Sequence, residues 1–203
     1  MFQSLGNEPM LGPEQIAYLQ ELRPHIKANI FLLATGMLVG ILSGAHFFDI
    51  APRFSESLGS FAQIFTGLPK PLLASAIFLN NGVKTFLVLL LGVVGGILPV
   101  CFLLLNGYAI GLVLYITIQS KGIASFLLAI VPHGIFELPA VLLGASIGIF
   151  LGARATKRLF GKFETTLKSD LRRAIRFYCG VILPLLLVAA FIEAFITSAI
   201  VSR

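Results

Sequence analysis

From Leu72 to Ile118 the chain is almost continuously apolar, and this run limits the fold more than any other feature. A helix needs only about 20 apolar residues to cross the hydrocarbon core of a bilayer, so the run is too long for one crossing. The run most plainly divides into two spans at Gly95-Gly96, which Pro99 follows. Hydrophobic residues make up 57% of the chain and charged residues only 12%. Soluble domains carry about 25% charged residues, so no soluble fold fits.

Comparable apolar sections occur along the whole chain. They predict an all-α fold, a polytopic transmembrane helical bundle of about five spans that forms a single integral membrane domain over residues 1–203. The expected spans cover residues 28–48, 72–98, 100–119, 123–152 and 177–201.

The basic residues are concentrated in one segment. Between Arg154 and Arg176 there are eight basic and two acidic residues, and eight minus two gives the +6 that is the formal net charge of the whole chain. Basic segments beside apolar spans stay on the cytoplasmic side, so nucleic acid is not expected as a partner. We therefore expect a multi-pass cell-membrane protein with a cytoplasmic segment at 1–27. Five crossings would place the C-terminus outside.

Two stretches between spans show helical amphipathic patterns. Apolar residues recur every three or four positions between residues 52 and 69, which predicts an outer amphipathic helix. A similar apolar stripe accompanies the charges of residues 153–176, which predicts a basic cytoplasmic helix at the interface.

Two sets of glycines are spaced four residues apart and share a helix face. Small residues let helix backbones approach closely in lipid, so both sets predict helix packing, within the bundle or across a homodimer. The sets are Gly36, Gly40 and Gly44, and Gly144, Gly148 and Gly152.

The sections that begin at Leu72 and Ala124 share a design of a short apolar piece, a polar break with glycine, and a longer apolar piece. The breaks are residues 80–82 and 132–134, where Pro132 disfavours an uninterrupted helix. We therefore expect two broken or re-entrant helices. Irregular backbone at membrane depth must be buried in protein or face water.

Several polar side chains fall inside the expected spans, where an isolated charge costs roughly 2.5–3.5 kcal/mol. They form an expected intramembrane cluster of Asn80, Asn81, Lys84, Asn106, His133, Glu137 and Glu193. We expect His133 and Glu137 in the outer half of the bundle, with Lys84, Glu193, Asn80 or Asn81 as hydrogen-bond partners.

Three interpretations of this cluster remain open: a structural network, a site that handles protons or solutes, and a metal site. A metal site would need Glu193 and His46 as further ligands, and the chain has no paired-histidine zinc motif. We therefore predict no metal and no cofactor. The sequence contains no arrangement typical of a nucleophilic triad or a phosphate-binding loop, so we expect no enzymatic activity.

Four short segments of the chain resemble the stage II sporulation protein M family of membrane proteins. The matching pieces lie between Leu72 and Thr197 and are residues 78–81, 105–107, 132–138 and 192–197. The most specific is Pro-His-Gly at 132–134 with Glu137 four residues after His133. The resemblance implies a non-enzymatic membrane protein. The best-known role of the family is to anchor peptidoglycan-remodelling enzymes during engulfment of the forespore.

The expected function is therefore a membrane-embedded scaffold, or a partner subunit of a membrane complex. Its expected partners are the lipid bilayer and other membrane proteins. The alternative is a permease for a small solute or ion, which would use the buried polar cluster at the two broken helices.

Overall fold

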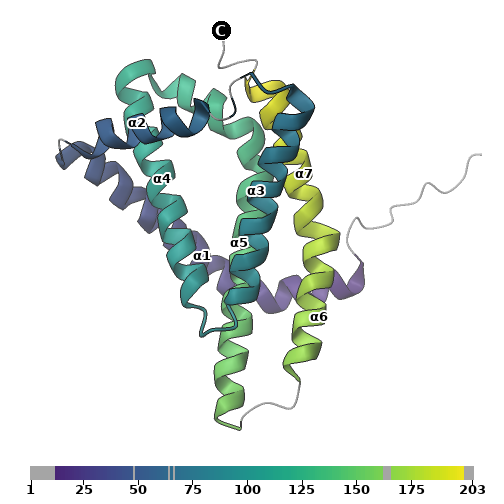
Figure 1. The fold of residues 1–203 in the computed structure, drawn as a ribbon. Helices are drawn as coiled ribbons and strands as arrows, with labels where there is room; N and C mark the ends of the chain where they lie inside the picture. Colours follow the sequence, from purple (N-terminus) through teal and green to yellow (C-terminus); the bar gives the residue numbers. More distant parts are fainter. Residues whose placement is uncertain (1–11, 48, 64, 66, 162–165, 199–203) are drawn as a thin grey trace, which may run out of the picture.

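A computed structural model describes residues 12–47, 49–63, 65, 67–161 and 166–198 (Figure 1). Among these residues, five helices are long and apolar enough to cross a membrane, which confirms the expected all-α membrane bundle. The first part of the segment at 1–27, residues 1–11, and the C-terminal end at 199–203 lie outside the described residues.

The helices follow one another with short connections. They are α1 (Pro13–His46), α2 (Ile50–Gln63), α3 (Lys70–Leu91), α4 (Ile97–Lys121), α5 (Ile123–Leu159), α6 (Leu167–Phe177) and α7 (Leu183–Ile192), with two π-helical turns, η1 (Tyr178–Ile182) and η2 (Glu193–Thr197). The segments α6, η1, α7 and η2 form one continuous helix, the last candidate span.

Helix α5 stands at the centre of the bundle and packs against α1, α3, α4, α6 and α7. In Figure 1, α3 and α7 lie on one side of it and α4 on the other, while α1 crosses the bundle obliquely and packs along α4. We call the end where α5 ends and α6 begins the basic end. The opposite end, which carries α2 and η2, is the far end.

The prediction of helix breaks at residues 80–82 and 132–134 is wrong. Helix α3 runs through the first, and α5 runs through the second with Pro132 and Pro139 inside it. Each proline removes one backbone hydrogen bond, which a helix packed inside a bundle tolerates. The 37 residues of α5 make a helix of about 55 Å, so its excess length projects beyond a core of about 30 Å instead of folding back.

Irregular helix geometry occurs in the last span instead. The turn η1 ends at Ile182, two residues before Pro184, which lacks an N–H and whose ring would collide with the carbonyl four residues earlier. A widened π-turn before the proline relieves that collision. The second π-turn, η2, begins at Glu193.

The break predicted between the second and third spans is confirmed. Helix α3 ends at Leu91 and α4 begins at Ile97. Gly95 and Gly96 in the connecting turn have φ values of 66° and 74°, a left-handed conformation that glycine adopts without strain.

The first glycine set joins α1 to α4 within one chain. Gly36 and Gly40 are buried, and a Cβ atom at either position would overlap the backbone carbonyl of Leu104 or Tyr108 on α4. Helix α4 contributes two buried glycines of its own to this contact, Gly107 and Gly111, which face the backbone of α1. The two backbones are therefore in direct contact, as small residues permit.

The second glycine set lies on α5 and faces α3 and the α3–α4 turn. A Cβ atom at Gly148 would overlap Pro99, and one at Gly152 would overlap the backbone of Gly96. Gly144 lies against the side chain of Thr85. The turn that reverses the chain is thereby packed against the centre of the bundle.

The helices outside the spans differ from the expected boundaries. The amphipathic helix predicted over 52–69 is α2, which begins at Ile50 and ends at Gln63, while Pro69 is the N-cap residue of α3. The single basic helix predicted over 153–176 is instead the end of α5 and the start of the last span. Residues 13–27 are the first part of α1.

Candidate functional site

Three ionisable side chains from two helices meet inside the bundle. His133 and Glu137 lie one turn apart on α5, and Glu193 begins η2 in the last span. The ligand-type atoms of the three side chains all lie within 4.8 Å of one another. We call these three residues the His133 cluster. Of the expected partners for His133 and Glu137, Glu193 joins them in this cluster.

Wide helical turns and prolines shape the backbone around the cluster. Pro132 precedes His133 within α5, and η2 carries Glu193 and Thr197 on a π-turn. π-Helical turns are rare in proteins, and those that occur are frequently found at functional sites. They displace side chains from the positions that a regular helix would give them.

The cluster lines a cavity of about 580 Å³ between α3, α5 and η2, which we call the Glu193 cavity. Polar side chains from all three helices contribute to its wall. Its lining is Phe65, Leu73, Ala76, Ile77, Asn80, Asn81, His133, Glu137, Glu193, Thr197 and Ser198.

A second cavity of about 420 Å³ lies between α3, α4 and α5, and we call it the Lys84 cavity. Its polar lining includes Lys84, Thr85 and Asn106. Asn81 and Glu137 line both cavities, so these two residues stand between them.

The polar side chains of the cavities bond little to one another. Asn80 donates to Asn81 Oδ1 at 3.1 Å, and Asn106 donates to the Phe102 carbonyl at 2.7 Å. Lys84 and Glu137 line the same cavity, but within the described part of the chain no ion pair joins them. His133 Nδ1 is buried and has no hydrogen-bond partner among the residues that the structure describes.

This arrangement can bind a cation or hold a proton between acceptors. Two carboxylates and an imidazole converge from separate helices, and the buried hydroxyls of Thr85 and Thr197 have no hydrogen-bond partner among the described residues. Buried polar groups are normally hydrogen-bonded, so unpartnered groups on a cavity wall indicate that water, an ion or a solute completes them. His46, at the end of α1, is not part of the cluster.

The model of the family described as stage II sporulation protein M matches residues 29–198. The chain belongs to this family. An uncharacterized protein of Methanocaldococcus jannaschii, MJ0793, is 30% identical over 125 residues, which cover 60% of this chain and 70% of that protein. No solved structure matches the chain. The matched region contains the His133 cluster and both cavities.

In this member of the sporulation protein M family, sequence reasoning missed a buried polar contact between α1 and α5. Asn29 is fully buried and donates to Ser146 Oγ at 2.8 Å, and Ser146 donates to the Leu142 carbonyl at 2.6 Å. The available signal was a single asparagine at the start of an otherwise apolar run. Tyr178 was also missed, and its hydroxyl donates to the Gly82 carbonyl at 2.7 Å.

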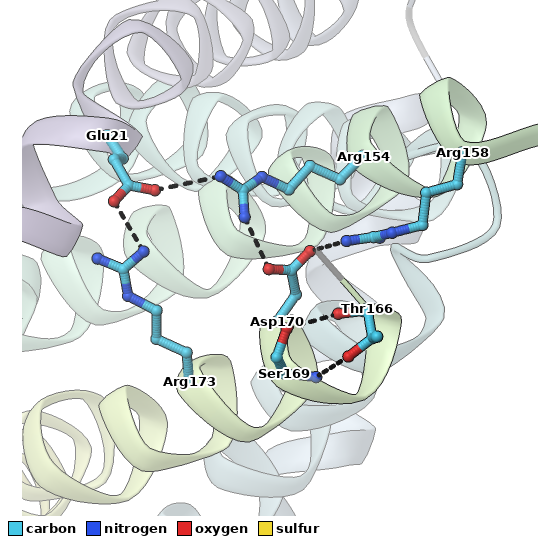
Figure 2. A network of polar contacts seen from close by, with 7 residues as sticks. All are labelled: Glu21, Arg154, Arg158, Thr166, Ser169, Asp170 and Arg173. Carbon is cyan, nitrogen blue, oxygen red and sulfur yellow. Dashed lines mark hydrogen bonds and ion pairs between the residues drawn. The ribbon is translucent and has the colours of Figure 1, made fainter. Parts of the chain in front are cut away.

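A second polar group, at the basic end, also went unrecognised in the sequence. Figure 2 shows Asp170 of α6 between two arginines of α5. Arg154 Nη1 lies 2.7 Å from Asp170 Oδ1, and Arg158 pairs with the other carboxylate oxygen. Asp170 is only 5% exposed. The basic segment, read in the sequence as a topology signal, also holds α5 and α6 together.

The same group extends to α1. Glu21 accepts from Arg173 at 2.7 Å and lies 3.5 Å from Arg154 (Figure 2). We call Glu21, Arg154, Arg158, Asp170 and Arg173 the Asp170 network. Thr166 caps α6 by accepting from the Ser169 backbone N–H, which fixes the start of the helix that carries Asp170.

Proposed function

We propose that this sporulation protein M family member is a non-enzymatic membrane protein that binds and passes a small cation through its two cavities. The observation that carries the proposal is the position of Glu137, which lines both the Glu193 cavity and the Lys84 cavity. A carboxylate between two cavities can accept a cation from one side and release it to the other.

The energetics of the bilayer support this function over a purely structural role. Ionisable groups within a span cost several kcal/mol unless they are paired or hydrated. A structural network would use them in hydrogen bonds with one another. Here the imidazole of His133 and the hydroxyls of Thr85 and Thr197 have buried atoms that find no hydrogen-bond partner in the part of the chain that the structure describes.

The membrane orientation belongs to the same proposal. Basic segments stay in the cytoplasm, so we place the basic end, with the first part of α1 and the Asp170 network, on the cytoplasmic side. The far end, with α2 and η2, then lies outside, as the sequence predicted. The Glu193 cavity, which η2 lines, would be the outer of the two.

Flux through proteoliposomes tests the proposal. We expect vesicles that contain the full chain to dissipate imposed gradients of H⁺, K⁺ or Zn²⁺, each followed with an enclosed indicator, faster than empty vesicles. Glu137→Gln should reduce the flux at least tenfold, because the side chain keeps its shape and loses its charge. Glu56→Gln, a change at an exposed carboxylate of α2, should leave the flux unchanged. Flux equal to that of empty vesicles for all three ions would contradict the proposal.

The second candidate is the expected scaffold or partner subunit, and one observation favours it. Leu159 and Phe160 are 85% and 72% exposed at the tip of the basic end, beyond the Asp170 network. Large apolar side chains at that position fit contact with another membrane protein or with a second copy of the chain. Light scattering in mild detergent tests this role: a dimer that Leu159→Ser with Phe160→Ser converts to a monomer would support it.

A further inference from the structure

We propose that His133, Glu137 and Glu193 form a binding site for one divalent transition-metal ion of the Zn²⁺ or Mn²⁺ class. The inference rests on the proposed function, because it names the class of cation that the Glu193 cavity takes. The ligand atoms come from two helices and lie within 4.8 Å of one another.

The balance of charge favours a divalent ion. Two carboxylates this close repel each other when both are ionised, and in a span neither is stabilised by bulk water. A divalent cation between Glu137 and Glu193 cancels both charges. Lys84 lines a cavity with Glu137, but within the described part of the chain it forms no ion pair with either carboxylate, and its single charge could balance only one of the two.

The donor atoms select the kind of metal. Carboxylates alone would suit Mg²⁺ or Ca²⁺, whereas an imidazole beside them favours Zn²⁺, Fe²⁺ or Mn²⁺. Such ions bind nitrogen and oxygen at about 2.0–2.2 Å, so ligand atoms that share one ion are at most about 4.4 Å apart. The separations of up to 4.8 Å therefore require only a small contraction when the ion binds.

The unpartnered groups around the cluster are an independent indication of a ligand. Thr197 lines the Glu193 cavity and is 6% exposed, and its hydroxyl has no hydrogen-bond partner among the residues between 12 and 198 that the structure describes. His133 lines the same cavity, and its buried Nδ1 also has no partner among these residues. Asn80 and Asn81 place amide groups on the same wall. A hydroxyl and amide oxygens can complete the coordination of an ion, directly or through water.

The principal competing arrangement is a single proton shared between Glu137 and Glu193. It also removes the repulsion between the two carboxylates, and it gives no role to His133 Nδ1. The two arrangements differ in one measurable property, the affinity of the purified protein for a transition metal.

Metal binding by the full chain in detergent tests the inference. The protein is stripped with a chelator, then titrated with Co²⁺, whose visible absorption reports ligand type and geometry, and with Zn²⁺ in competition with a fluorescent chelator. We expect one ion per chain. Glu193→Gln and His133→Gln should each weaken Zn²⁺ binding at least tenfold, and Glu56→Gln should leave it unchanged.

Where a glutamine variant fails to fold, Glu193→Asp keeps the charge and shortens the reach, and it should also weaken binding at least tenfold. The inference is overturned if the wild-type protein binds no transition metal, which is the result expected for a shared proton. It is also overturned if a folded Glu193 variant binds Zn²⁺ as tightly as the wild type, because the ion would then lie elsewhere.

The metal-binding experiment and the flux experiment can fail independently of each other. One Zn²⁺ bound through Glu193 and His133 without any flux would leave the metal site standing and remove the permease. Flux of H⁺ or K⁺ that depends on Glu137 in a protein without metal affinity would do the reverse.

Discussion

Glu137 and Glu193 present carboxylate oxygens within 4.8 Å of each other from two separate helices. Neither residue forms an ion pair within the described part of the chain. Two carboxylates held together by packed helices retain their mutual repulsion until a cation or a proton arrives. The proximity of Glu137 and Glu193 therefore indicates that the site binds a cation or a proton. The packing of the bundle holds α5 and the last span in this position.

The Asp170 network should be the strongest polar contribution to stability at the basic end. Asp170→Ala leaves Arg154 and Arg158 without the carboxylate between them, and removal of one partner of a buried pair typically costs about 3–5 kcal/mol. The measurement is chemical unfolding of the purified protein in detergent. The matched control is Asp49→Ala, because the Asp49–Arg53 pair is 74% and 81% exposed and should contribute less than about 1 kcal/mol. Equal losses in the two variants would refute this role.

The glycine contacts between helices should not tolerate large side chains. Gly40→Leu places atoms where α4 has its backbone, and Gly148→Leu places atoms against the Pro99 ring and the Val88 carbonyl of α3. Overpacking typically costs about 1–3 kcal/mol, and a collision with backbone lies at the upper end of that range. Gly59→Leu on α2 is the control, because a Cβ atom at Gly59 meets no atom within 4 Å. A melting temperature in detergent that all three variants share would show that these helices do not depend on close approach.

The hydrogen bond between the last span and α3 should have a smaller effect. Tyr178→Phe keeps the ring and removes the donor to the Gly82 carbonyl, for an expected loss of about 0.5–1.5 kcal/mol. Tyr115→Phe serves as the control, because the Tyr115 hydroxyl has no hydrogen bond to a described residue. Unfolding curves that do not distinguish Tyr178→Phe from the wild type would mean that water replaces the lost donor.

The sequence predicted the features that depend on local composition. Spans follow from apolar runs, and the turn between α3 and α4 follows from Gly95-Gly96, because the bilayer fixes the length of a crossing. The prediction of a break at Pro132 was wrong because it assumed that a helix cannot be much longer than the bilayer is thick. In the structure, the excess projects at the basic end and packs against α6.

The relationships between distant residues could not be predicted. The polar residues of the cluster were recognised one by one, but the approach of Glu193 to Glu137 depends on how the last span packs on α5. Asp170 was counted only as a charge in a basic segment. Its burial depends on α6 meeting the end of α5, which no local pattern encodes.

If the two cavities bind and pass a cation, water must reach both of them while the protein is in a membrane. In a chain whose native Cys101 and Cys179 are replaced by alanine, single cysteines are introduced as Ala76→Cys in the Glu193 cavity and Asn106→Cys in the Lys84 cavity. Leu38→Cys, at an apolar α1 position that is 56% exposed, is the lipid-facing control. The variants are treated in vesicles with a water-soluble, membrane-impermeant thiol reagent applied to each side in turn. We expect the cysteines at 76 and 106 to react and the cysteine at 38 not to react. If the cysteines at 76 and 106 are as unreactive as the one at 38, the cavities are closed to water and cannot pass a cation.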